Sequence, residues 1–132
     1  LPISLALAWP DRVPRAAQPL DWRQASNWTF EPLDTEAFPA VELARRAGAA
    51  GGTAPAVYNA ANEVGVDAFC ARRIGFLDIV DTMASVLDEH LGGAQRDQRP
   101  GARHVGNAEL SLDAVLAADS WARIRAAELL GS

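Results

Sequence analysis

Residues 53–73, TAPAVYNAANEVGVDAFCARR, decide the fold that the sequence predicts. Their apolar side chains recur at steps of three and four residues, which is the spacing of one face of an α-helix. The predicted buried face consists of Val57, Ala60, Ala61, Val64, Ala68, Phe69 and Ala71. Thr53 is predicted to cap this helix, and Pro55 is tolerated in its first turn. We therefore expect one long helix around which the rest of the chain packs.

A polar cluster lies beside that apolar face. Asn59, Asn62 and Glu63 stand at positions i, i+3 and i+4, so their side chains meet on one stripe of the helix. Asn is a mediocre helix former, and two of them in mid-helix compete with the backbone unless other groups bond them. Three interpretations stay open at this point. The cluster pins a neighbouring loop or helix end, it contacts a substrate or cofactor, or it is simply solvated.

The flanking sequence predicts three more helices. Residues 37–47 carry apolar side chains largely along one side, with Thr35 as the predicted cap, and residues 76–91 repeat apolar positions at helical spacing. Ser111 is predicted to cap the last helix. The buried stripe of that helix is expected to consist of Leu112, Val115, Leu116, Trp121, Ile124 and Leu129. Residues 92–107 are polar, Gly-containing and Arg-rich, which predicts a mobile surface loop.

These elements predict a mainly α fold, a small four-helix bundle over residues 34–132 preceded by an extended arm with one strand. The connecting arm covers residues 1–33. It begins with a short helix that Pro10 ends, and its one strand signal is the alternating pattern of residues 22–31. A single strand cannot satisfy its own hydrogen bonds. The strand is therefore expected to pair with a second copy in an oligomer, or with a sheet built by residues outside this chain.

Composition narrows the possible functions. The chain has 132 residues, enough for one domain with a core, and its net charge of -5 argues against a nucleic-acid partner. All 12 basic residues are Arg, which excludes Schiff-base catalysis and the lysine of a phosphate loop. The single Cys70 is predicted to be a buried thiol in a reducing, cytoplasmic compartment. No apolar run approaches 18 residues, so no membrane span is predicted.

No residue of the chain is predicted to be catalytic, cofactor-binding or metal-binding. The Gly-rich residues 48–52 precede a helix but also follow one, which is the wrong context for a dinucleotide loop. His90 and His104 have no second ligand three or four residues away. The paired acids of residues 76–91 are typical of a solvated helix face.

Several segments together resemble the C-terminal part of the 1-deoxy-D-xylulose 5-phosphate (DXP) reductoisomerase family. These segments are LPISLALAWPDRV, WTFEPLDTEAFPAVELA, GGTAPAVYNAANEVGVDAF, RIGFLDIV and LDAVLAADSWAR. The Trp-Pro opening combined with the Asn-Ala-Ala-Asn-Glu helix is specific, and the order fits nearly the whole chain. Only residues 92–107 have no clear counterpart in the family.

The resemblance implies an oxidoreductase of the non-mevalonate isoprenoid pathway. The family converts DXP to 2-C-methyl-D-erythritol 4-phosphate with NADPH and a Mg or Mn ion, as a homodimer. This chain has no Gly-x-Gly-x-x-Gly loop and no cluster of metal-binding acids. The cofactor, metal and substrate sites are therefore expected in the dinucleotide and catalytic domains, which are the implied partners. In the family the Asn-Ala-Ala-Asn-Glu helix packs against the catalytic domain, so Asn59, Asn62 and Glu63 are expected to support active-site groups held elsewhere.

Two other functions remain open from the sequence. The chain could be an independent helical interaction module that kept the sequence of an enzyme domain, or the bundle could hold its own enzymatic site around Glu63. An upstream dinucleotide domain in the same reading frame would exclude the first, and replacement of Glu63 tests the second.

Overall fold

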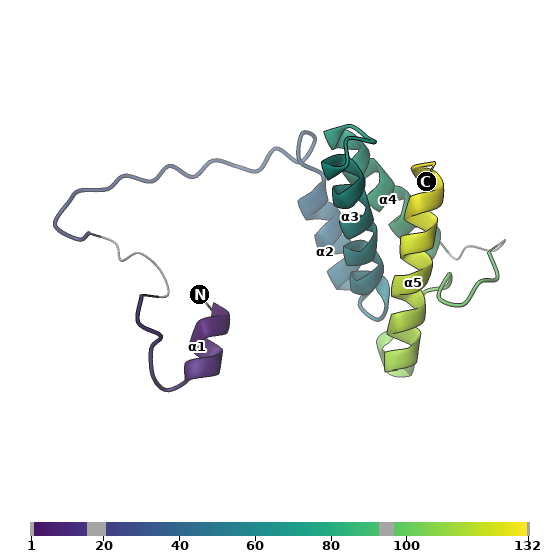
Figure 1. Cartoon of the computed structure of the whole chain (residues 1–132), viewed down its shortest axis with the longest axis horizontal. Coiled ribbons are helices and arrows are strands. Elements are labelled where there is room, and N and C mark those ends of the chain that lie inside the picture. Colours follow the sequence, from purple (N-terminus) through teal and green to yellow (C-terminus); the bar gives the residue numbers. More distant parts are fainter. Residues whose placement is uncertain (1, 16–20, 93–96, 132) are drawn as a thin grey trace. The chain divides into compact units, whose positions relative to one another are not determined.

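The computed structural model describes residues 2–15, 21–92 and 97–131. The chain divides into two compact units, residues 1–32 and residues 33–132, and each is described by itself (Figure 1). In the described part of the chain, no helix has the length and apolarity needed to cross a bilayer.

The arm contains one short helix and an irregular segment. Helix α1 spans Pro2–Ala8, which confirms the predicted N-terminal helix. The strand predicted over residues 22–31 does not form in the described part of the arm, because residues 25–34 have no regular secondary structure. Trp28 and Phe30 stay 68% and 84% exposed. A strand needs a hydrogen-bonded neighbour, and the arm has none within the described residues.

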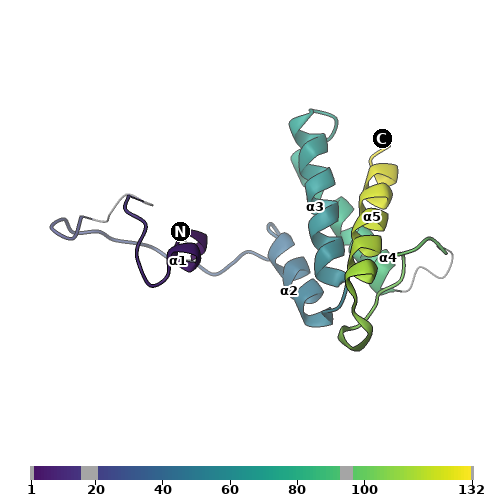
Figure 2. The same cartoon turned by 60° about the horizontal axis from the view of Figure 1, so that its bottom comes forward.

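The second unit is the four-helix bundle that the sequence predicts. Helix α2 spans Ala40–Ala50, α3 spans Ala54–Cys70, α4 spans Phe76–Leu91 and α5 spans Leu112–Leu129. A single 3-10 turn, η1 at Asn107–Glu109, precedes α5. Helices α3 and α4 contact each other and both outer helices, whereas α2 and α5, which the structure describes in full, do not touch. The bundle is thus a central α3–α4 pair with α2 and α5 on its flanks (Figure 1). In the turned view of Figure 2, α4 lies partly behind α5.

The core is built largely from small and medium side chains. Its main cluster consists of Val57, Ala60, Ala61, Ile79, Met83, Val86, Ala102, Ala118, Trp121, Ala122 and Ala126. A smaller cluster of Ala47, Ala54 and Leu87 joins α2 to the central pair. At Gly65 an added Cβ would lie 3.1 Å from Ile79 Cγ2, so the missing side chain lets α3 and α4 approach closely.

Of the three predicted helix caps, Thr35 is wrong, Thr53 stands at the N-cap position of α3 without a side-chain capping bond, and Ser111 is confirmed. Thr35 does not cap α2; instead the Asp34 carboxylate accepts hydrogen bonds from two backbone amides in the turn before it. Thr53 makes no capping hydrogen bond because its hydroxyl is used inside the bundle. Ser111 does cap α5, since its Oγ accepts from the Ala114 amide at 3.2 Å.

The predicted buried stripe of α5 is mostly wrong. Leu112, Leu116, Ile124 and Leu129 are 73%, 55%, 53% and 40% exposed. The buried face consists of Ala118, Trp121, Ala122 and Ala126. Three alanines at four-residue spacing allow α5 to lie close to α3, which turns the larger aliphatic side chains outward.

The structure also corrects two smaller predictions. Cys70 is exposed in the last turn of α3, so the predicted buried thiol is wrong. Residues 97–106 of the predicted mobile loop pack against the bundle, where Ala102 is fully buried. Asp97 accepts a 2.9 Å hydrogen bond from Trp121 Nε1 and is bound by Arg99, which also pairs with Glu128 of α5. Residues 93–96 lie outside the described residues.

Candidate functional site

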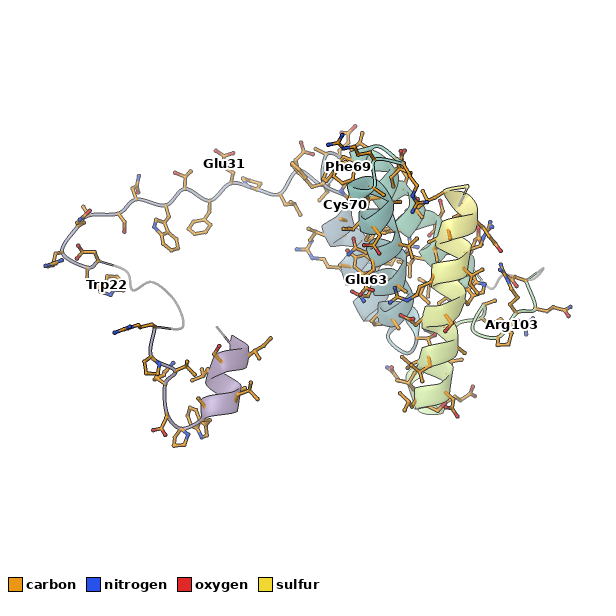
Figure 3. All side chains as sticks on the ribbon, in the orientation of Figure 1. Trp22, Glu31, Glu63, Phe69, Cys70 and Arg103 are labelled. Carbon is orange, nitrogen blue, oxygen red and sulfur yellow. The ribbon has the colours of Figure 1, made fainter. Side chains whose placement is uncertain are left out.

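The polar cluster of α3 is divided between two sides of the helix. Asn59 Nδ2 donates to Glu63 Oε1 at 2.8 Å, as the i, i+4 spacing predicts. Glu63 Oε2 lies 2.8 Å from a guanidinium nitrogen of Arg123, which in turn pairs with Asp119 at 2.8 Å. Asn59 and Glu63 therefore connect α3 to α5 across the surface of the bundle (Glu63 is labelled in Figure 3).

Arg123 determines the electrostatics of this pair. Hydrogen bonding to its guanidinium, with a further hydrogen bond from Asn59, lowers the pKa of the Glu63 carboxyl below its ordinary value. The carboxylate is therefore ionised at neutral pH and poorly suited to donate a proton. A structural role as a bridge between α3 and α5 accounts for the contacts of both Asn59 and Glu63 without any bound ligand.

Asn62 lies on the other side of α3. Its side chain is half-buried and makes no hydrogen bond to the part of the chain that the structure describes. It lines an apolar groove of about 370 Å³ between the start of α2 and the helices α3 and α4. The groove is lined by residues 37–41, by Tyr58, Asn62 and Val66 of α3, and by Phe76, Leu77, Ile79, Val80 and Met83 of α4. We call this surface the α2–α4 groove.

A buried series of hydrogen bonds, which the sequence did not predict, holds the N-terminal end of α3 in place. His90 is fully buried, and its Nδ1 lies 3.2 Å from the Ala102 carbonyl oxygen. A carbonyl only accepts, so Nδ1 carries the proton and Nε2 accepts from Thr53 Oγ1 at 2.8 Å. The Thr53 oxygen accepts in turn from the Val105 amide at 3.1 Å. Every member is satisfied with a neutral imidazole, which ties residues 102–105 to the bundle.

This arrangement predicts that stability falls in mild acid. Burial lowers the pKa of His90 below its ordinary value of 6.5. The unfolded chain then binds a proton more readily than the folded one, so the stability gained from neutral His90 is complete above about pH 6.5 and declines as the pH falls below it. Urea unfolding between pH 7.5 and 5 should show this decline.

The variant His90→Gln, which cannot titrate, is the control for that measurement. Its stability should change less between pH 7.5 and 5 than that of the unaltered chain, although it starts lower. Equal pH slopes for the two proteins would contradict the assignment to His90. The only charged or titratable side chain that packs against the His90 ring among the described contacts is His104, at 5.6 Å between ring centroids.

The described residues offer no metal centre. In residues 2–15, 21–92 and 97–131, no three His, Cys, Asp or Glu side chains are grouped so that they could share an ion. The acids that lie close to one another, such as Asp97 and Glu128, are held by Arg99 instead.

The comparisons with known proteins decide the family. The sequence profile described as "DXP reductoisomerase C-terminal domain" matches residues 1–125. This chain belongs to that family. The chain is 68% identical over 129 residues to the 1-deoxy-D-xylulose 5-phosphate reductoisomerase of Cutibacterium acnes, covering 98% of the chain and 31% of that protein. It is 54% identical over 132 residues to the reductoisomerase of Paenarthrobacter aurescens, covering 100% of the chain and 30% of that protein.

Solved reductoisomerase structures share the fold. The Zymomonas mobilis DXP reductoisomerase in complex with NADPH is 40% identical, with a TM-score of 0.73 over 99% of this chain and 31% of that one. A DXP reductoisomerase in complex with NADPH, fosmidomycin and magnesium is 32% identical, with a TM-score of 0.75 over 98% of this chain and 31% of that one. The chain thus corresponds to the C-terminal domain and spans about a third of the length of these DXP reductoisomerases.

Proposed function

We propose that this chain is the supporting C-terminal domain of an NADPH-dependent DXP reductoisomerase and is inactive alone. The observation that carries the proposal is its match to a family defined as a C-terminal domain, over about a third of the length of complete reductoisomerases. NADPH, a Mg or Mn ion and DXP would then be bound by the dinucleotide and catalytic domains. The described residues of this chain supply no acid cluster that fits the ion.

The supporting role divides among the three residues of the α3 cluster. Asn59 and Glu63 would keep α3 and α5 in a fixed relation through Arg123. Asn62, which has no partner among the described residues, would bond a group of the catalytic domain. The irregular residues 25–34 would complete a strand at the edge of that domain's sheet. The assembled enzyme would be a cytoplasmic homodimer.

A turnover assay tests the proposal. The isolated chain, mixed with DXP, NADPH and Mn²⁺, should leave the NADPH absorbance unchanged. The positive control is a chimera in which this chain replaces the corresponding last third of the Cutibacterium acnes enzyme. The two sequences are 68% identical over that region. The chimera should consume NADPH. Turnover by the isolated chain, or an inactive chimera, would refute the proposed function.

Replacing Glu63 with Gln tests the bridge. We expect a small fall in the melting temperature of the isolated chain, because the pair with Arg123 lies at the solvated surface. The matched control is Glu109→Gln, which removes the same charge from a side chain without a hydrogen bond to the described residues. A fall in the kcat/KM of the chimera with Glu63→Gln but not with Glu109→Gln supports the role. Equal effects contradict it.

The exposed arm predicts that the isolated chain self-associates. Trp22, Trp28 and Phe30 are 86%, 68% and 84% exposed, and unpaired extended segments with apolar side chains associate readily. Size-exclusion chromatography should show an oligomer that the double substitution Trp28→Ser and Phe30→Ser shifts toward the monomer. Leu116→Ser on α5 is the control. A clean monomer of the unaltered chain would contradict the prediction.

A further inference from the structure

A second hollow of the bundle lies between residues 97–105 and the first half of α5. Its volume is about 450 Å³, which falls within the range of about 300–1,000 Å³ for small-molecule sites. Its lining includes Gln98, Arg99, Arg103, Val105, Ala114 and Ala117. We call this hollow the α5 pocket. It shares no lining residue with the α2–α4 groove.

The walls of the α5 pocket are held in place by contacts behind them. At one end of residues 97–105, Asp97 accepts the 2.9 Å hydrogen bond from Trp121 Nε1 of α5. At the other end, the Val105 amide donates a 3.1 Å hydrogen bond into the bundle. Between them Gly101, with a φ of +83°, lies so close to α5 that an added Cβ would stand 2.1 Å from the Ala117 carbonyl oxygen. The segment is therefore fixed against α5, and the pocket needs no ligand in order to form.

Arg103 gives the pocket an uncompensated positive charge. The other arginine of the lining, Arg99, is neutralised because it pairs with Asp97 at 2.7 Å and with Glu128 at 2.7 Å. The same pairing occupies the Asp97 carboxylate, which therefore repels an incoming anion little. Arg103 is exposed and makes no ion pair or hydrogen bond with the described residues (it is labelled in Figure 3). Its planar guanidinium can bind two oxygens of a carboxylate or a phosphate at once.

The rest of the lining suits a ligand that also has an apolar part. Val105, Ala114 and Ala117 are half-buried, and the small side chains of the two alanines leave room against α5. The Gln98 amide is exposed, has no partner among the described residues, and can both donate and accept a hydrogen bond. A bare anion would bind weakly, because an exposed ion pair in water contributes little free energy. Burial of an apolar group beside the alanines would supply the additional free energy.

We propose that the α5 pocket binds a small amphiphilic anion. The carboxylate or phosphate of this ligand pairs with Arg103, and its apolar part lies against Val105, Ala114 and Ala117. The site is additional to the NADPH, metal and DXP sites that the other domains would supply, and it belongs to this chain alone.

Saturation-transfer NMR of small probes tests the pocket in the unaltered chain. Hexanoate and hexyl phosphate have both an acid group and an apolar part, whereas 1-hexanol lacks the charge and acetate lacks most of the apolar part. Hexanoate and hexyl phosphate should each bind about fivefold more tightly than 1-hexanol, which is the upper range for one exposed ion pair. Acetate should bind more weakly than hexanoate, because it buries almost no apolar surface.

Two pairs of variants locate the binding. Arg103→Gln should weaken the binding of hexanoate about fivefold. Arg72→Gln is its control, because Arg72 is also exposed and without a partner among the described residues, but follows the far end of α3. Ala114→Leu fills the apolar side without changing a charge and should weaken both amphiphiles. Its control is Ala127→Leu, at a half-buried position of α5 outside the lining.

Binding that needs both the acid group and Arg103 supports the proposal, and the tighter of the two amphiphiles then identifies the acid group. Three results would overturn it. They are no saturation transfer to either amphiphile, equal affinities for hexanoate and 1-hexanol, and equal losses in Arg103→Gln and Arg72→Gln. Because Arg103 and Arg72 are both exposed, neither substitution should unfold the chain, and melting temperatures check this.

Discussion

Trp121→Ala is expected to lower the free energy of unfolding by about 3–5 kcal/mol, the range for removing a buried Trp side chain. Trp121 is 2% exposed and is the largest fully buried side chain of the bundle. Its ring packs beside His90 at 5.6 Å between centroids, so its loss opens a cavity next to the buried hydrogen-bonded chain. For a domain of this size the melting temperature should fall by more than roughly 12 °C. Urea unfolding followed by circular dichroism measures both quantities.

Trp121→Phe separates the two contributions of this side chain. Phe keeps most of the apolar volume but removes the Nε1 hydrogen that Asp97 accepts at 2.9 Å. We expect a smaller loss of about 1–2 kcal/mol, because Asp97 keeps Arg99 as its main partner. Leu116→Ala at an exposed position of α5 is the control for helix propensity. If Trp121→Ala destabilised the chain no more than that control, the core assigned to α5 would be wrong.

The existence of each helix could be predicted from the sequence, but the buried face of α5 could not. Apolar periodicity depends on local spacing, and the spacing of residues 53–73 and 76–91 is unambiguous. In α5 the larger aliphatic side chains compete with Ala118, Ala122 and Ala126 for the inward position. A sequence pattern assigns the larger apolar side chains, Leu and Ile, to the buried face of a helix. Close approach of α5 to α3 instead requires the small side chain of Ala at the buried positions. Which of the two faces inward depends on a neighbouring helix that the pattern does not contain.

The same limit applies to the candidate site. The contact of Asn59 with Glu63 is local and follows from the i, i+4 spacing. Arg123 is far along the chain from Glu63, so no sequence pattern joins them. His90 stands seven residues after Met83 and four after Val86, which is a core position, and that spacing could have indicated its burial. Its partners Thr53 and Ala102 could not be predicted, because tertiary packing alone brings them together.

The two ends of the central helix pair therefore have different roles. Near Thr53 and His90 the bundle is closed by its own residues, and every polar group of the buried chain has a partner. Near Phe38 and Leu77 the apolar surface is open and Asn62 is unpartnered among the described residues. The first end holds the domain together, and the second stays open among the described residues. Substitutions at the two ends should accordingly differ in whether the isolated chain or only the chimera is affected.

Thr53→Val is an isosteric substitution at the closed end of the bundle, and among such substitutions we expect it to lower the stability of the chain most. Valine matches the shape of threonine but removes the hydroxyl that donates to His90 Nε2 at 2.8 Å and accepts from the Val105 amide at 3.1 Å. His90 Nε2 and the Val105 amide then lose this partner, while His90 Nδ1 keeps its hydrogen bond to the Ala102 carbonyl oxygen. Each unsatisfied buried group costs about 1–3 kcal/mol, so we expect a loss of roughly 2–4 kcal/mol.

Thr53→Ser is the matched control, because it keeps both hydrogen bonds and loses one methyl group, worth about 1 kcal/mol. The two variants should therefore separate clearly in urea midpoints at pH 7.5. Equal midpoints for Val and Ser would show that the hydroxyl does not hold this end of the bundle.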